Sequence, residues 1–113
     1  MTKTDVIDYI DRIKPNVYTS EQKALWINAL EKKLRTEVLE NYEDAEEPET
    51  GTLIASGPYE DMYYRWVEAQ IDYANNEIQR YNNALALFND GYDKFKAWYS
   101  RTHTHKTTSL SLL

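Results

Sequence analysis

The 113-residue chain contains no cysteine, only three glycines and only three prolines. The absence of cysteine excludes disulfides and thiolate metal sites. So few glycines and prolines leave little material for the many tight turns of an all-β fold. No apolar run approaches the roughly 20 residues that a membrane-spanning helix needs, and the N-terminus lacks the apolar centre of a signal peptide. We therefore expect one soluble, intracellular domain without a membrane contact.

Basic residues are also in short supply. Thirteen basic and nineteen acidic residues give a net charge of -6, which disfavours a general nucleic-acid binder because such a protein must neutralise phosphates. The charge is unevenly placed: the net charge through Asp93 is -10, whereas four basic residues, both histidines and no acidic side chain follow from Lys94 onward. An acidic body with a basic tail indicates a charged partner or a neighbouring subunit, with a merely solvated tail as the alternative.

Aromatic side chains are abundant, and they lie on one helical stripe. Eleven of the fifteen aromatic residues fall between Tyr59 and Tyr99. Apolar residues in this stretch recur at alternating steps of four and three, the period of an α-helix. They are Val67, Ile71, Ala74, Ile78, Tyr81, Leu85, Phe88, Tyr92, Phe95 and Tyr99. An unbroken helix to Arg101 would be about 60 Å long, too long for so small a domain to shield. We predict a break at residues 82–83, or as a second choice at 89–91, which gives an antiparallel pair.

Two shorter helices are predicted before this stretch. The first has Thr4 as its N-cap, ends before Pro15 and places on one face Val6, Tyr9, Ile10 and Ile13. The second begins at Thr19 or Ser20, where Thr19 and Gln22 have the spacing of a capping box. Its predicted buried side comprises Leu25, Trp26, Ile27, Leu30, Leu34, Val38 and Tyr42. The predicted fold is therefore all-α, a small bundle of about four helices in a single domain spanning residues 1–113.

Two segments are predicted to lie outside the helices. Residues 43–57 read as a long acidic loop between the second and third helices, because five of the seven residues from 43 to 49 are acidic and Pro48 and Gly51 disfavour helix. This loop could bind a cation or dock a partner; the alternative is a mobile, solvated loop. Residues 102–113 are predicted to be a mobile tail, which ends on the leucines Leu110, Leu112 and Leu113.

Possible metal ligands are few and poorly grouped. His103 and His105 are the only imidazoles, and two ligands fall short of the three or four that zinc sites take. The row of Asp5, Asp8 and Asp11 on the first helix is better explained as a solvated face near a positive helix N-terminus than as a cation site. We therefore expect neither a metal ion nor another cofactor.

Catalytic groupings are likewise not found in the sequence. Glu68, Asp72 and Glu77 could in principle act as paired carboxylates, but the Glu-x-x-His pairs of di-iron bundles do not occur. There is no glycine-rich phosphate loop and no nucleophile motif. We expect that the protein is not an enzyme.

Four short motifs follow one another between Leu53 and His103. They are Leu53-Ile54 followed by Pro58-Tyr59-Glu60-Asp61-Met62-Tyr63; Glu68-Ala69-Gln70-Ile71-Asp72-Tyr73; Arg80-Tyr81-Asn82-Asn83 leading to Leu87-Phe88-Asn89; and Trp98-Tyr99-Ser100-Arg101-Thr102-His103. In order and spacing they resemble the head-tail connector, or head-completion, proteins of tailed phages and prophages of Gram-positive bacteria. The first fifty residues match only through Lys14-Pro15, Tyr18 and Trp26. The chain departs from the pattern at Ala55-Ser56, where proline is common, and at Gly91, where alanine is expected.

This resemblance implies a structural role in virion assembly. Such proteins form a ring beneath the portal that extends the DNA channel and offers the tail a docking surface. The implied partners are the portal protein, tail or neck proteins and further copies of the chain, and the implied location is the virion neck, preceded by the host cytoplasm during assembly. No sequence-specific nucleic acid is expected. The predicted subunit or partner contacts are Glu43, Asp44, Glu46, Glu47, Glu49, Lys94, Lys96, Arg101 and Lys106.

A second interpretation belongs to another class of function. An acidic helical module that regulates or inhibits a basic protein partner would have the same composition and charge. It would form a tight one-to-one complex and have no place in a virion.

Overall fold

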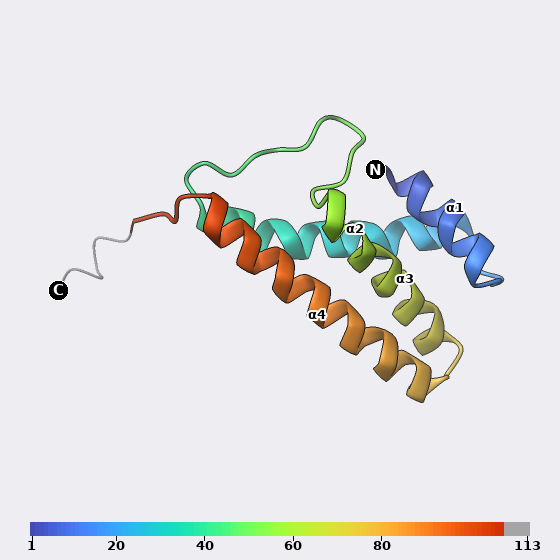
Figure 1. The fold of residues 1–113 in the computed structure, drawn as a ribbon. Helices are drawn as coiled ribbons and strands as arrows, with labels where there is room; N and C mark the ends of the chain where they lie inside the picture. The colour runs from blue at the N-terminus through green and yellow to red at the C-terminus, as the bar shows by residue number, and fades with distance from the viewer. Residues whose placement is uncertain (108–113) are drawn as a thin grey trace.

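The computed structural model describes residues 1–107, and these form a bundle of four α-helices. The elements are α1 (Lys3–Ile13), α2 (Ser20–Glu37), η1 (Leu39–Asn41), η2 (Gly57–Tyr59), α3 (Asp61–Ala74) and α4 (Ile78–Thr102), with η marking single-turn 3-10 helices. The molecule is elongated, with extents of 53 × 31 × 21 Å, and α3 and α4 form a long antiparallel hairpin (Figure 1). The predicted all-α class is confirmed, and the only β pairing within residues 1–107 is an isolated bridge between Tyr42 and His105.

A threonine side chain caps the N-terminus of each of the first two helices. Thr2, and not Thr4 as predicted, caps α1: its hydroxyl accepts a hydrogen bond from the Asp5 amide, while the Asp5 carboxylate accepts one from the Thr2 amide at 2.9 Å. This reciprocal pair places Thr4 inside the first turn. The predicted cap of α2 is confirmed, because the Thr19 hydroxyl accepts from the Gln22 amide at 3.1 Å.

An ion pair between buried Lys23 and exposed Asp11 joins α1 to α2. The ammonium of Lys23, a residue only 2% exposed, donates to Asp11 Oδ1 at 2.6 Å and to Asn16 Oδ1 at 3.0 Å. Asp11 is therefore not part of a purely solvated row. On α2, Leu25 was predicted to be buried, and this prediction is wrong because its side chain is 61% exposed.

The turn between α3 and α4 lies at residues 75–77, so both predicted breaks are wrong. Asn76 adopts a left-handed conformation with φ 59°. The amide of Asn76 donates to the Tyr73 carbonyl, and that of Glu77 donates to the Asp72 carbonyl at 2.8 Å. This is the Schellman arrangement that satisfies the last carbonyls of a helix, with asparagine in place of the usual glycine. Residues 82–83 and 89–91 lie inside α4.

Asn76 provides a test of this turn. An alanine has no side chain to offset the left-handed conformation, so we expect Asn76→Ala to lower the free energy of unfolding by about 1 kcal/mol and Asn76→Gly to be nearly neutral. Asn82→Ala is the matched control, since alanine is the better helix former at an exposed position inside α4. Urea unfolding measures all three variants. A greater loss of stability in Asn82→Ala than in Asn76→Ala would contradict this account.

The core confirms most of the aromatic stripe. Six of its members are buried: Val67, Ile71, Phe88, Tyr92, Phe95 and Tyr99. Ala74 and Ile78 are exposed because they flank the turn. At Gly91 a Cβ atom would lie 3.2 Å from the Cβ of Met62, so glycine allows α3 and α4 to approach closely where the resemblance leads one to expect alanine.

Candidate functional site

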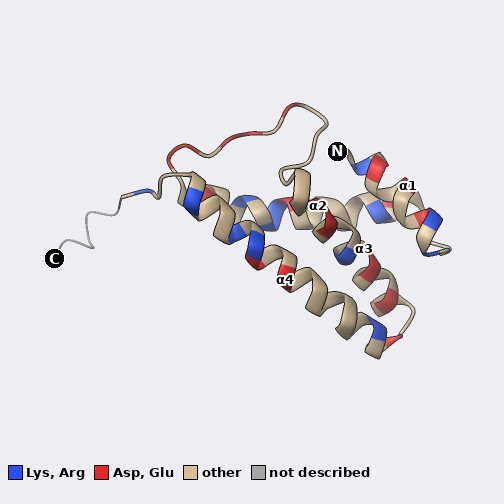
Figure 2. Cartoon of the chain, viewed as in Figure 1, with Lys and Arg blue, Asp and Glu red and all other residues tan. Residues whose placement is uncertain are grey.

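The connecting segment, residues 42–56, joins η1 to η2 and carries most of the predicted acidic contact residues. It forms an arc beside α2 and the end of α4, with acidic positions along its first half (Figure 2). Hydrogen bonds to Met1 and to α2 hold its second half. The Leu53 amide donates to the Met1 carbonyl at 2.9 Å, and the Ile54 amide donates to Glu31 Oε1 of α2 at 2.9 Å. An ion pair between Glu47 and Arg35 of α2 holds its middle.

The start of the predicted tail is paired with the start of the connecting segment. The Glu43 amide donates to the Thr104 carbonyl at 2.8 Å, the Thr104 amide donates to Asp44 Oδ1 at 2.7 Å, and the Lys106 amide donates to the Asn41 carbonyl at 2.9 Å. The first part of the predicted mobile tail is therefore joined to the connecting segment and to η1 by backbone hydrogen bonds at Thr104 and Lys106. The leucines on which the predicted tail ends, Leu110, Leu112 and Leu113, lie outside the described residues.

Both histidines pack against tyrosines beside this pairing. The His103 ring stacks on Tyr99 with centroids 3.6 Å apart and planes 3° from parallel, and the His105 ring lies 4.4 Å from that of Tyr42. The Nδ1 atom of His103 is 2.8 Å from the Thr102 hydroxyl. Within residues 1–107, no three His, Cys, Asp or Glu side chains come together in a way that could hold a metal ion.

A cleft that we name the aromatic groove lies between the connecting segment and the end of α4. Its volume is about 330 Å³. The lining residues are Met1, Glu46, Glu47, Pro48, Glu49, Thr52, Leu53, Ile54, Ser56, Trp98, Tyr99 and His103. The Tyr99 hydroxyl accepts a hydrogen bond from the Glu46 amide at 3.2 Å, which ties the two walls together. The groove thus combines apolar and aromatic walls with carboxylates.

The predicted basic contacts fall into two groups. Lys94 forms an ion pair with Asp90 at 2.9 Å, and Lys96 forms one with Asp93 at 3.6 Å while its ammonium lies over the Tyr92 ring. The side chains of Arg101 and Lys106 have no acidic partner within 4.0 Å among the described residues. Of the predicted acidic contacts, Glu47 alone forms an ion pair with a basic side chain in the part of the chain that the structure describes, and that side chain, Arg35, was not predicted.

A buried hydrogen-bond network supports the connecting segment and was missed by sequence reasoning. The hydroxyl of Tyr63, a fully buried residue, donates to Glu31 Oε2 at 2.6 Å and accepts from the Ala55 amide at 3.0 Å. Burial raises the pKa of the Glu31 carboxyl, although the hydrogen bonds from Tyr63 and Ile54 act in the opposite direction. The spacing of Glu31 on α2 gave no signal of this role, because its partners lie more than twenty residues away.

The raised pKa of Glu31 predicts a pH dependence of stability. Because the folded state binds this proton more tightly than the unfolded chain, the contribution of Glu31 is fully present below its ordinary pKa of 4.5 and is lost as the pH rises through the folded-state value. We expect the free energy of unfolding of the wild type, relative to Glu31→Gln, to fall between pH 4.5 and neutrality. Urea unfolding of both proteins across this range measures it, and a relative stability that rises with pH would contradict the assignment.

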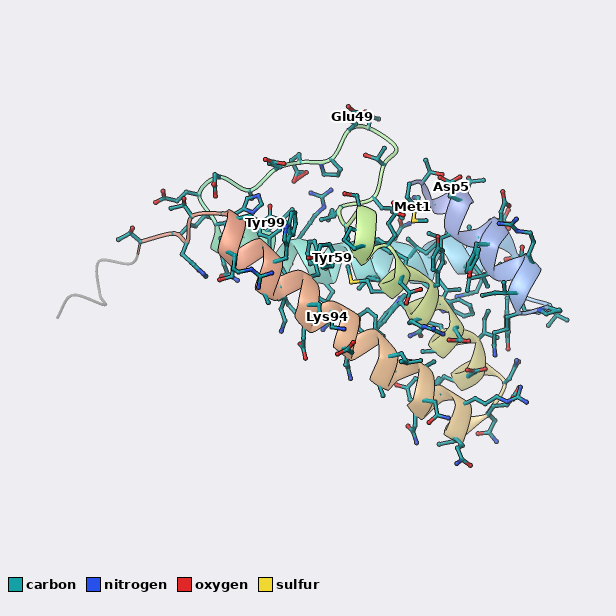
Figure 3. The ribbon with its side chains drawn as sticks, in the orientation of Figure 1. Met1, Asp5, Glu49, Tyr59, Lys94 and Tyr99 are labelled. Atoms are coloured by element: carbon teal, nitrogen blue, oxygen red, sulfur yellow. The ribbon has the colours of Figure 1, made fainter. Side chains whose placement is uncertain are left out.

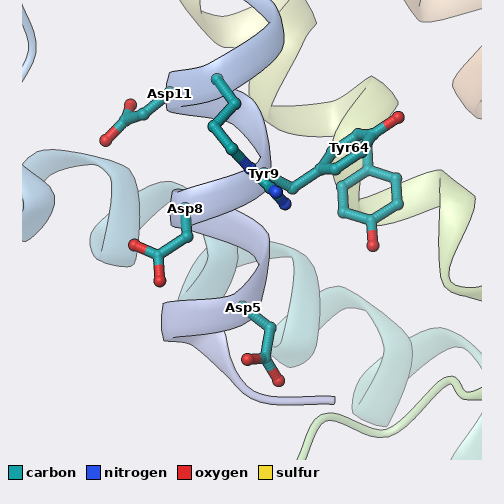
Figure 4. Close-up of a pocket in the computed structure, with 6 residues that line it drawn as sticks. Asp5, Asp8, Tyr9, Asp11 and Tyr64 are labelled. Atoms are coloured by element: carbon teal, nitrogen blue, oxygen red, sulfur yellow. The ribbon is translucent and has the colours of Figure 1, made fainter.

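A second, more open cleft lies on the outer face of α1. It measures about 710 Å³ and is lined by Asp5, Asp8, Tyr9, Asp11, Arg12 and Tyr64. Figure 4 shows the Asp8 and Asp11 carboxylates on one side of the helix, the Asp5 carboxylate at its N-terminal end, and the two tyrosine rings together on the other side. The Asp5 carboxylate is engaged by the cap and that of Asp11 by Lys23, so the row does not converge on one point.

Exposed apolar side chains lie toward the end of the molecule opposite the aromatic groove. Within residues 1–107 six large hydrophobic residues are mainly exposed, and five of them lie in or near the α1–α2 and α3–α4 connections. Ile13 ends α1, Val17 lies between α1 and α2, Leu25 is in the second turn of α2, and Tyr73 and Ile78 flank the turn between α3 and α4. Figure 1 shows the α1–α2 and α3–α4 connections side by side at this end, and the Tyr18 hydroxyl donates to Asn75 Oδ1 across them at 2.6 Å. We name these five residues the apolar end.

Comparison with known proteins adds no relative. No protein-family model, no curated protein and no solved structure matches the chain. None of the helices within residues 1–107 combines the length and the apolar character needed to cross a membrane.

Proposed function

We propose that the protein is a structural subunit of a phage or prophage head-tail connector that assembles as a ring under the portal. The residues that carry the resemblance support this proposal by their position. The four motifs fall on the stretch before η2, on η2 itself and on the α3–α4 hairpin. Their aromatic side chains pack on one another, with the Tyr59 and Trp98 rings 5.2 Å apart and those of Trp98 and His103 6.1 Å apart. The motifs therefore describe one structural unit.

The apolar end is the observation that carries self-association. Scattered exposed hydrophobic residues need no explanation, but several such residues near two neighbouring connections at one end of an elongated molecule are typical of an interaction surface. Val17 is 92% exposed and Tyr73 62% exposed. In a ring, neighbouring subunits or the portal would cover this end.

The surface charge of the protein supports a place in the wall of a DNA channel to which DNA does not adhere. Among the described residues, ten of the nineteen acidic side chains have no basic partner within 4.0 Å, whereas eight of the thirteen basic side chains have an acidic partner. The unpaired surface charge is thus mainly negative, and like charge prevents DNA from sticking to a channel wall. The acidic connecting segment and the basic residues Arg101 and Lys106 would face neighbouring proteins in the neck.

Mass photometry and negative-stain electron microscopy of the purified protein test the proposal, alone and with the portal protein encoded beside its gene. We expect rings, or rings that form on addition of the portal. The double variant Val17→Ser/Ile78→Ser should abolish them, while Leu87→Ser, a matched change at a residue 50% exposed outside the apolar end, should not. A strict monomer with no affinity for the portal, from a gene flanked by a toxin or nuclease and no capsid genes, would refute the connector.

The aromatic groove favours a second candidate. An acidic regulatory or inhibitor module would use such a cleft to bind a basic protein in a one-to-one complex. Variants of the apolar end separate the two candidates, because they should destroy ring assembly and leave a one-to-one complex at the groove intact.

A further inference from the structure

The aromatic groove has the chemistry of a receptor for a long cationic side chain. Trp98 and Tyr99 contribute rings from the last turns of α4, and Leu53 contributes an apolar wall from the connecting segment. Glu46 and Glu49 place carboxylates along the same cleft, and Figure 3 shows Glu49 at the crest of the segment, so that its charge belongs to the rim. An alkyl stem would contact the apolar wall while its cationic head met the half-buried Trp98 ring and the carboxylates.

Among the described residues, no lysine or arginine lines the aromatic groove. Arg35 of α2 forms an ion pair with the Glu47 carboxylate. Lys94 and Lys96 on α4 are paired with aspartates on their own helix.

The cleft on α1 provides an internal comparison. It also combines tyrosine rings with carboxylates, but the guanidinium of Arg12 already lies 5.8 Å from the centre of the Tyr9 ring, and Lys23 already binds Asp11. Two of its carboxylates or rings are thus already matched to a cation of the chain, whereas in the aromatic groove only Glu47 has a basic partner among the described residues, and Glu46 and Glu49 have none within 4.0 Å.

We propose that the aromatic groove binds an arginine side chain presented by a basic segment of another protein. Charge complementarity selects this occupant. Within residues 1–107, the acidic side chains without an oppositely charged partner outnumber the basic ones by ten to five, and a second copy of the chain would bring the same surplus of negative charge. Arginine fits better than lysine, because its planar guanidinium stacks on aromatic rings and pairs with carboxylates through two parallel hydrogen bonds. The proposal does not depend on ring assembly.

The first experiment measures fluorescence anisotropy of a labelled short peptide of alternating arginine and leucine. The matched probe replaces each arginine by citrulline, which keeps the shape and removes the charge. We expect the arginine peptide to bind about tenfold more tightly than the citrulline peptide at physiological ionic strength. Equal binding of the two probes, or no binding of either, would overturn the proposal.

Charge-matched variants locate the binding. Glu46→Gln/Glu49→Gln removes two carboxylates from the groove, and Glu21→Gln/Glu40→Gln removes two exposed carboxylates elsewhere that have no basic partner within 4.0 Å. We expect the first pair to weaken peptide binding about fivefold and the second less than about twofold. Equal losses would show attraction by net charge alone and refute a site.

Nuclear magnetic resonance completes the test. We expect the arginine peptide to shift the signals of the Trp98 indole and of the Ile54 amide while leaving those of Tyr9 and Tyr64 unchanged. The opposite pattern would assign the peptide to the cleft on α1 and overturn the proposal. Concentration-dependent dimerisation that Glu46→Gln/Glu49→Gln abolishes would assign the groove to a second copy instead.

Discussion

Replacing Phe88 by alanine should lower the free energy of unfolding by about 3 to 5 kcal/mol. Phe88 is 1% exposed, and its ring lies 5.0 Å from that of Trp66 on α3 and 5.6 Å from that of Tyr92. Removing it opens a cavity in the middle of the α3–α4 hairpin, which the long helices on either side cannot easily close. This loss is a large part of the roughly 5 to 15 kcal/mol by which a domain of this size is stable.

The neighbouring Leu87 is the matched control. It occupies the adjacent position of α4 but is 50% exposed, so Leu87→Ala should cost less than about 1 kcal/mol. Urea unfolding followed by far-ultraviolet circular dichroism measures both variants. A loss below about 1 kcal/mol for Phe88→Ala would show that this ring is not part of the core.

The second large effect is expected from Lys14, which forms an ion pair with Asp72 at 2.7 Å. The Asp72 side chain is 2% exposed and that of Lys14 is 19% exposed. Lys14→Met would leave a buried carboxylate without its counter-charge, at a cost of about 3 kcal/mol. Thermal and urea unfolding measure this loss.

Two further variants show whether burial is the cause. Lys14→Met/Asp72→Asn removes both charges and should recover much of the lost stability, because no uncompensated charge stays inside. Lys94→Met breaks an ion pair whose side chains are 70% and 64% exposed, and it should cost less than about 1 kcal/mol. A double variant as unstable as Lys14→Met alone would disprove this account.

The helical periodicity predicted the class of fold and most of the core, but it could not locate the hairpin turn. Asparagine pairs occur at residues 75–76 and again at 82–83, and local preference does not distinguish them. The choice is made by tertiary contacts, because Tyr18 binds Asn75 and Lys14 binds Asp72. The loop after α1 thus fixes the end of α3, and no pattern within α3 and α4 contains that information.

The sequence predicted which segments of the candidate site are charged, but it did not predict the aromatic groove. Composition indicated an acidic segment at residues 43–49 and a basic end to the chain. The aromatic groove arises because Glu46 meets Tyr99, 53 residues further along, and such a pairing has no local signature. The role of Glu31 likewise has no local signature, because its hydrogen bonds come from Ile54 and Tyr63, which are distant in the sequence.

The connecting segment is held by residues from opposite ends of the described chain, with Met1 bound to Leu53 and Thr104 bound to Glu43. During synthesis on the ribosome, Met1 and Leu53 are both made long before Thr104. While α4 is still being synthesised, the segment can fasten to α1 and α2, but one wall of the aromatic groove does not yet exist. A partner that binds the groove would therefore recognise only molecules in which α4 has been made and packed, and premature association with a nascent chain would be avoided.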